Sequence, residues 1–217
     1  KQRLQNSVRG RFALDAKVND FTFAGARFAG GTSSRSTDDT LNGYFNRANA
    51  TFDQYYIRFE APKEWVIKYG KYFKDLKLSA GKFAIPFEYT ELTWDPDISP
   101  GGVALQYVSP DIRTSYLPGF NLYSNSGFLW LDESSAYNTD PLLFVAQGGA
   151  KTEQFGPLGS TLNVSAALYD FENLKGKTPN TNSVGTNTRY WTGDNIVAAS
   201  PLIGTWKYQY NVFDLLI

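Results

Sequence analysis

The sequence has no cysteine, no methionine and no histidine among its 217 residues. Without cysteine and histidine, the chain cannot form disulfides, use thiol chemistry, build Cys/His zinc sites or assemble a histidine-based catalytic triad. It also has no phosphate-binding loop and no G-x-S-x-G nucleophile motif. We therefore expect neither enzyme activity nor a cofactor. The missing methionine is expected to reflect an N-terminus that has been processed or cut.

The chain also lacks an excess of either charge and a long apolar run. Its 21 basic residues are balanced by 21 acidic ones, whereas proteins that bind nucleic acid usually carry a basic surplus. We therefore expect no nucleic-acid partner. No apolar stretch approaches the length of a membrane-spanning helix, and the residues after Lys1 do not resemble the apolar core of a signal peptide.

Aromatic residues and glycine are abundant, with 14 Tyr, 16 Phe, 5 Trp and 19 Gly. The mean hydropathy is nevertheless negative. A chain that is polar on average but rich in aromatic residues is typical of short, two-faced strands joined by long polar loops. Two classes of protein fit this composition. One is a soluble β-sandwich or lectin-like domain, and the other is an outer-membrane β-barrel.

Alternation of apolar and polar side chains is the main local signal. Residues 7–18 place apolar side chains on one face and charged side chains such as Arg11 and Asp15 on the other, which indicates a β-strand. Eight further strands are predicted, at residues 21–28, 51–61, 76–87, 103–108, 120–133, 141–153, 160–171 and 204–213. The connector 62–75 has room for a helical turn. Gly81 and Lys82 interrupt the alternation, which indicates a β-bulge.

The connections between these strands alternate in length. Those near residues 19, 62, 109 and 155 are compact, and the longer polar ones lie at 29–48, 88–101, 134–140 and 173–201. This alternation is typical of an all-β, antiparallel, up-and-down transmembrane β-barrel, which has short periplasmic turns and long outer loops. A sandwich with Greek-key connections has no reason to sort its loops in this way. We treat residues 1–217 as a single barrel domain or a fragment of one.

Five motifs, in order, give residues 9–107 a resemblance to a known family. They are the arginines Arg9 and Arg11, Thr40-Leu41-Asn42-Gly43, Asp53-Gln54, Gly81-Lys82 with Pro86-Phe87, and Trp94-Asp95-Pro96-Asp97 followed by Gly102-Val103-Ala104-Leu105-Gln106. This pattern resembles the putative porin family of bacterial outer-membrane barrels. The resemblance implies an outer-membrane location, contact with membrane lipid and a homo-oligomer such as a trimer. It also implies a barrel of about sixteen strands or more, so we expect the chain to be part of a larger barrel, with a closed barrel of eight or ten strands as the alternative.

The predicted strand faces and loops indicate three groups of site residues. The predicted pore-lining residues on the polar strand faces are Arg9, Arg11, Asp15, Lys17, Gln54, Arg58, Glu60, Lys77 and Lys151. The predicted acids of the pore mouth are Asp95 and Asp97. The predicted aromatic residues at the lipid interface are Tyr55, Phe87, Trp94, Tyr107 and Trp206. No metal site is predicted, because neither Asp38-Asp39 nor Asp95-Pro96-Asp97 has the spacing of a calcium loop.

These residues leave three functional hypotheses open. The first is a passive diffusion channel, in which charges of both signs across the pore orient and filter small hydrophilic solutes. The structural alternative for these residues is that the same charges pair with one another and only stabilise the inner wall. The second hypothesis is a structural barrel that is plugged or sheathes another component. The third is a soluble carbohydrate-binding domain that uses tryptophan and tyrosine platforms.

Overall fold

A computed structural model gives the architecture of most of the chain. It describes residues 7–31, 38–40, 49–90, 93–95, 98–115, 118–131, 139–155, 158–175, 196–200, 203–206, 209 and 211–217. Two parts of the expected pattern, Leu41-Asn42-Gly43 and the mouth residue Asp97, lie outside the described residues.

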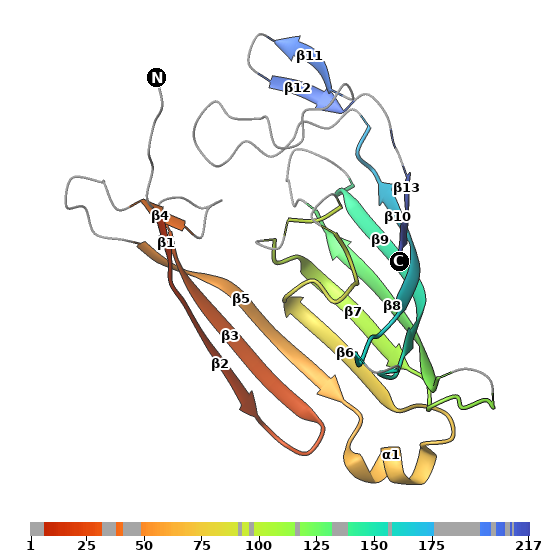
Figure 1. Ribbon diagram of the computed structural model, residues 1–217. Coiled ribbons are helices and arrows are strands. Elements are labelled where there is room, and N and C mark those ends of the chain that lie inside the picture. Colours follow the sequence, from red (N-terminus) through yellow and green to blue (C-terminus); the bar gives the residue numbers. More distant parts are fainter. Residues whose placement is uncertain are drawn as a thin grey trace.

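One antiparallel sheet of nine strands dominates the fold (Figure 1). Its strands are β2 (Arg11–Lys17), β3 (Thr22–Gly31), β5 (Asn49–Glu60), β6 (Asp75–Lys82), β7 (Gly101–Val108), β8 (Phe120–Trp130), β9 (Leu142–Thr152), β10 (Asn163–Glu172) and β13 (Asn211–Leu216). Each strand pairs with the strand before and after it in this order, so the predicted all-β, up-and-down arrangement is confirmed. β2 and β13 are the two edges, and within the described residues the sheet is not closed into a barrel.

Two strand pairs lie outside this sheet. β1 (Ser7–Arg9) pairs with β4 (Asp38–Thr40), and β11 (Ile196–Ser200) pairs with β12 (Ile203–Trp206). Two predictions were therefore wrong in detail, because the expected loops 29–48 and 173–201 contain strand residues. The single strand predicted at 204–213 is also divided, and only β13 joins the large sheet, through its pairing with β10.

The helical turn expected in the connector 62–75 is confirmed as α1 (Lys63–Tyr69). Pro62 precedes the first helical residue, where its fixed φ suits a helix start, and Gly70 follows the last. α1 lies at the end of the sheet where the compact turns cluster (Figure 1). No helix among the described residues is long and apolar enough to cross a membrane.

The strand register divides the sheet into two contrasting faces. Residues that pair directly across strands point to the same side, and one such row runs Phe59–Leu78–Leu105. Large apolar side chains on this side are exposed, among them Phe12, Leu14, Ile57, Leu105, Leu168 and Leu215. We call this side the apolar face. The opposite side carries the row Arg58–Ser79–Ala104 and is called the inner face.

The chain between β6 and β7 folds back over the inner face in its described residues, 83–90, 93–95 and 98–100, which we call the strap (Figure 1). Ser99, near the C-terminal end of the strap, contacts Arg27 of β3, and Thr93, six residues earlier, donates a hydrogen bond to Asp214 of β13. These two strands are seven steps apart in the sheet, a distance of about 34 Å if the sheet were flat. Six residues of extended chain reach only about 20 Å. The sheet therefore curves around the strap.

The hydrophobic core lies between the strap and the inner face. Phe83, Phe87 and Trp94 of the strap are buried against a cluster on the sheet that includes Leu129 and Leu143. Most strand residues on this part of the inner face are small, apolar or amide-bearing, such as Ala104, Leu143 and Gln147. The expected bulge at Gly81 is not observed, since β6 keeps one register with both neighbours. Gly81 instead has a φ of +120°, just before the chain leaves the sheet for the strap.

Candidate functional site on the inner face

The inner face gathers most of the predicted pore-lining residues. The strand register places eight of the nine on the nine-stranded sheet: Arg11, Asp15, Lys17, Gln54, Arg58, Glu60, Lys77 and Lys151. Cross-strand rows such as Glu60–Lys77–Gln106 show that these positions share one side. The exception is Arg9, which lies on β1 and pairs with Asp38 in the small sheet.

Arg58 is the centre of a charged cluster near the compact-turn end of the inner face. Its guanidinium donates hydrogen bonds to Glu60, at 2.6 Å, and to Asp15, at 2.8 Å. The same group lies 5.2 Å from the ring centroid of Phe23 and 5.5 Å from that of Tyr56, which adds cation–π attraction. Several of the predicted pore charges therefore pair with one another, as the alternative interpretation of these residues expected.

A second cluster forms around Asp53 at a β-bulge in β5. The register of β5 with β3 shifts beside Arg27, so Asp53 is the extra residue. This shift turns both Asp53 and Gln54 toward the inner face, where both are buried. Arg27 forms an ion pair with the Asp53 carboxylate, and Arg11 approaches it at 3.9 Å.

Ser99 of the strap completes this second cluster. Its hydroxyl donates a hydrogen bond to Asp53 at 3.1 Å and accepts hydrogen bonds from Gln54, at 3.1 Å, and Arg27, at 3.3 Å. One strap residue is thus held by three buried or half-buried side chains of β3 and β5. The bulge makes this arrangement, because strict alternation would turn Asp53 and Gln54 to opposite faces.

Two glutamines fasten the middle of the strap to the sheet. The side-chain amide of Gln147 accepts a hydrogen bond from the Glu88 backbone N–H, at 2.9 Å, and donates one to the Glu88 carbonyl, at 2.7 Å. Asn125 donates a further hydrogen bond to Gln147 at 3.0 Å. Gln106 donates to the carbonyl of Pro86 at 3.1 Å. These amides satisfy backbone groups that a buried loop would otherwise leave unpaired.

Aromatic side chains of the strap also pack against the inner face. The Phe87 ring packs over Gly127 of β8, where a Cβ atom would lie 2.6 Å from Phe87 Cζ. The Trp94 and Tyr169 rings meet with centroids 5.9 Å apart. These contacts correct the expected placement of Phe87 and Trp94 at the lipid interface. Both are buried between the strap and the inner face, away from the apolar face.

The remaining nominated residues are distributed over three places. Tyr55 is exposed on the apolar face, and Tyr107 lies on the same face, in register with Leu76. Trp206 belongs to β12, outside the large sheet. Asp95 is exposed on the strap, which places it over the inner face rather than on an outer loop. In the described part of the chain, no group of three or more acidic side chains could hold a metal ion.

The inner face also holds functional candidates that were not predicted from the sequence. They are Arg27, Asp53, Ser99, Gln106, Asn125 and Gln147. The alternation did place Gln147 on the strand face that also carries Lys151, but its role depends on the strap, which lies far away along the chain. The orientation of Asp53 could not be predicted from alternation, because a β-bulge at this residue breaks the alternation. The best available signal was the Asp53-Gln54 pair itself, since two adjacent polar residues break the alternation of a strand.

Comparison with known proteins gives one match. A family model described as putative porin matches residues 1–200 of the chain. Searches of curated proteins and of solved structures each found no match.

Proposed function

Because this chain belongs to the putative porin family, we propose that it is a passive diffusion channel of the bacterial outer membrane. Its proposed cargo is small hydrophilic solutes and ions. The observation that carries this proposal is the strap, which is fastened across an inner face lined by charges and amides. A wall that is polar inside and apolar outside suits a water-filled passage through lipid.

The strap sets the proposed filter. It covers part of the inner face and so narrows the space that a solute can cross, while leaving charged side chains beside it. Arg11 and Arg27 lie around Asp53 at one end of the strap, and the exposed Asp95 lies on the strap itself. Fixed charges of both signs across a narrow passage orient polar solutes and favour one sign of ion.

Conductance measurement tests this proposal directly. The purified full-length protein is inserted into planar lipid bilayers, and stepwise current and the reversal potential in a salt gradient are recorded. We expect steady single-channel conductance. The double substitution Asp95→Asn with Asp97→Asn is expected to shift the reversal potential toward anions, because it removes two negative charges. Insertion without any conductance overturns the channel proposal and favours a structural barrel.

The membrane location is tested separately, by extraction. We expect the protein to partition into the outer-membrane fraction and to need detergent for release, since its apolar face is too large to meet water. Recovery in buffer alone overturns the location and favours the soluble carbohydrate-binding alternative.

A further inference from the structure

The segment that joins β5 to β6 exposes its apolar side chains. We call residues 63–73, which comprise α1 and the turn after it, the collar. No residue of α1 is buried, and Trp65 and Ile67 are 54% and 85% exposed. A helix of this length is not stable by itself in water, and exposed apolar groups add no stability there. The collar therefore leaves two large apolar side chains, Trp65 and Ile67, open to any surface that meets this end of the sheet.

The collar is also strongly basic. It contains Lys63, Lys68 and Lys71 and a single acid, Glu64. Among the described residues, none of these three lysines has a carboxylate within ion-pair distance. Lys68 lies 5.1 Å from the centroid of the adjacent tyrosine ring, and Lys71 lies 4.7 Å from that of its own neighbour. The ammonium groups of Lys68 and Lys71 thus lie beside aromatic rings, and all three lysines remain available to an anion.

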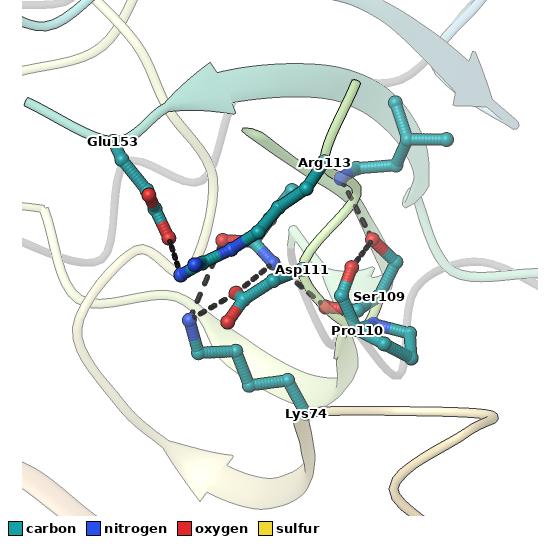
Figure 2. Close-up of polar contacts among 8 residues, drawn as sticks. Lys74, Ser109, Pro110, Asp111, Arg113 and Glu153 are labelled. Atoms are coloured by element: carbon teal, nitrogen blue, oxygen red, sulfur yellow. Dashed lines mark hydrogen bonds and ion pairs between the residues drawn. The ribbon is translucent and has the colours of Figure 1, made fainter. Parts of the chain in front are cut away.

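Lys74, the residue after the collar, differs from the collar lysines because its ammonium group is hydrogen-bonded within the protein. Its ammonium donates a hydrogen bond to Asp111 at 2.7 Å and a weaker one to Asn121 at 3.5 Å. Figure 2 shows this contact beside the neighbouring pair Arg113–Glu153. The network ties the start of β6 to the turns that follow β7 and β9. The collar lysines take no part in it.

The collar is attached at the border of the apolar face. The Tyr107 hydroxyl donates a hydrogen bond to the carbonyl of Tyr72 at 2.6 Å. Tyr107 pairs with Leu76 of β6 and points to the apolar face. It is the neighbour on that face of the exposed Leu105, while Gln106 between them points to the inner face. The collar is therefore continuous with the exposed apolar side chains of β5, β6 and β7.

We propose that the collar lies in the lipid headgroup layer at the compact-turn end of the sheet and binds anionic phospholipids. Trp65 and Ile67 enter the boundary between headgroups and acyl chains. Lys63, Lys68 and Lys71 extend to lipid phosphates, as long basic side chains do at interfaces. The occupant is a phospholipid because the collar combines exposed apolar side chains with three lysines and is continuous with the apolar face, which we propose to meet lipid. The proposal rests on the apolar face meeting lipid, as proposed above, but not on conduction.

The absence of cysteine allows a direct test of depth. A single cysteine is introduced by Ile67→Cys in the full-length protein, labelled with a nitroxide and reconstituted in phosphatidylcholine vesicles that contain phosphatidylglycerol. The matched control is Asp20→Cys, at a compact turn of the same end where the side chain is 79% exposed. We expect the Ile67 label to be more accessible to oxygen than to a water-soluble relaxant, and the Asp20 label to show the reverse. Equal exposure of both labels to water overturns the proposal.

Lipid selectivity tests the lysines. Association of spin-labelled phosphatidylglycerol is measured relative to spin-labelled phosphatidylcholine, at low and high salt. Each lysine near an anionic surface contributes about fivefold, so Lys63→Gln, Lys68→Gln and Lys71→Gln together are expected to abolish the preference. High salt is expected to weaken it. An unchanged preference in the triple variant overturns the proposal.

A second triple variant separates this proposal from the channel function. Lys17→Gln, Lys77→Gln and Lys151→Gln remove the same charge from the inner face. We expect this variant to keep the lipid preference and to change ion selectivity, and the collar variant to do the opposite. Loss of lipid preference in both variants would mean that net charge alone attracts the lipid, which also overturns a specific role for the collar.

Discussion

Gln147 and Glu88 are joined by two hydrogen bonds, in which a side-chain amide pairs with a backbone peptide group as a neighbouring strand would. Gln147 belongs to β9 and Glu88 to the strap, 59 residues away along the chain. The pair is part-buried, so its loss leaves a peptide N–H and C=O without partners. This side chain therefore contributes two of the hydrogen bonds that hold the middle of the strap.

Replacement of Gln147 is expected to loosen the strap. Gln147→Leu keeps a similar volume but removes both hydrogen bonds, so we expect the free energy of unfolding to fall by about 2 kcal/mol. Single-channel conductance is expected to rise and become noisier, because the strap no longer holds one position. Gln154→Leu, at an exposed turn, is the control and should change neither quantity. Unchanged conductance in a folded Gln147 variant contradicts a role of the strap in narrowing the passage.

Asp53 is expected to matter for both selectivity and stability. Asp53→Asn removes the carboxylate that lies beside Arg27 and Arg11, and breaking a buried pair in this way costs about 3 kcal/mol. Two positive charges then remain near the strap, so the reversal potential is expected to shift toward anions. Asp20→Asn removes an acid from an exposed turn and serves as the control. An identical shift in both variants would show that only the net charge matters.

Two tyrosine rings lie over glycines of the adjacent strand, Tyr56 over Gly25 and Tyr123 over Gly149. A Cβ at Gly149 would also lie 2.7 Å from a backbone carbonyl, so Gly149→Ala is expected to lower the free energy of unfolding by about 2 kcal/mol. Gly25→Ala is expected to cost less, since only the Tyr56 side chain must move. Gly10→Ala meets nothing within 4 Å and should be neutral. Equal costs at all three positions, in urea unfolding from vesicles, contradict the ring-over-glycine packing.

Removal of two tyrosine hydroxyls on the inner face is expected to change the free energy of unfolding differently. The Tyr123 hydroxyl donates a hydrogen bond to Asn163 at 2.8 Å, whereas the buried Tyr169 hydroxyl lies near Trp94 and makes no hydrogen bond of good geometry among the described residues. Tyr123→Phe is therefore expected to cost about 1 kcal/mol of unfolding free energy, and Tyr169→Phe to be neutral or stabilising. The same unfolding measurement compares them. A larger cost at Tyr169 shows that its hydroxyl has a partner after all.

The Lys74–Asp111 contact predicts a dependence on pH. A hydrogen bond from Lys74, supported by one from Asn121, lowers the pKa of the Asp111 carboxyl from its ordinary value, which is about 3.9. The folded state thus binds this proton less readily than the unfolded state, so the contact stabilises the fold above the unfolded pKa. That stabilisation is lost as the pH falls through the folded pKa. Asp111→Asn should therefore lower the stability at neutral pH and leave it unchanged in strong acid. A stability difference that persists in strong acid contradicts this assignment.

The sequence alone predicted the strands of the sheet and the two characters of its faces. Alternation with a period of two depends only on which residues are neighbours along the chain. It therefore predicts from the sequence the positions of β2, β3 and β5 to β10. The same signal placed Arg58 and Glu60 together on the inner face, which their contact confirms. It also separated the compact turns from the long connections.

Only the tertiary structure decided where the described residues of the strap lie. Their sequence is typical of a long connection, and nothing local distinguishes a loop that extends away from the sheet from a strap that folds over its inner face. The choice depends on partners far away in the chain: Gln147 for the backbone of Glu88, Gly127 for the ring of Phe87, and the bulge at Asp53 for Ser99. A period-two pattern predicts on which side of a strand a residue lies. The burial of a loop depends instead on the hydrogen-bonding groups and the space that distant strands provide where the loop packs.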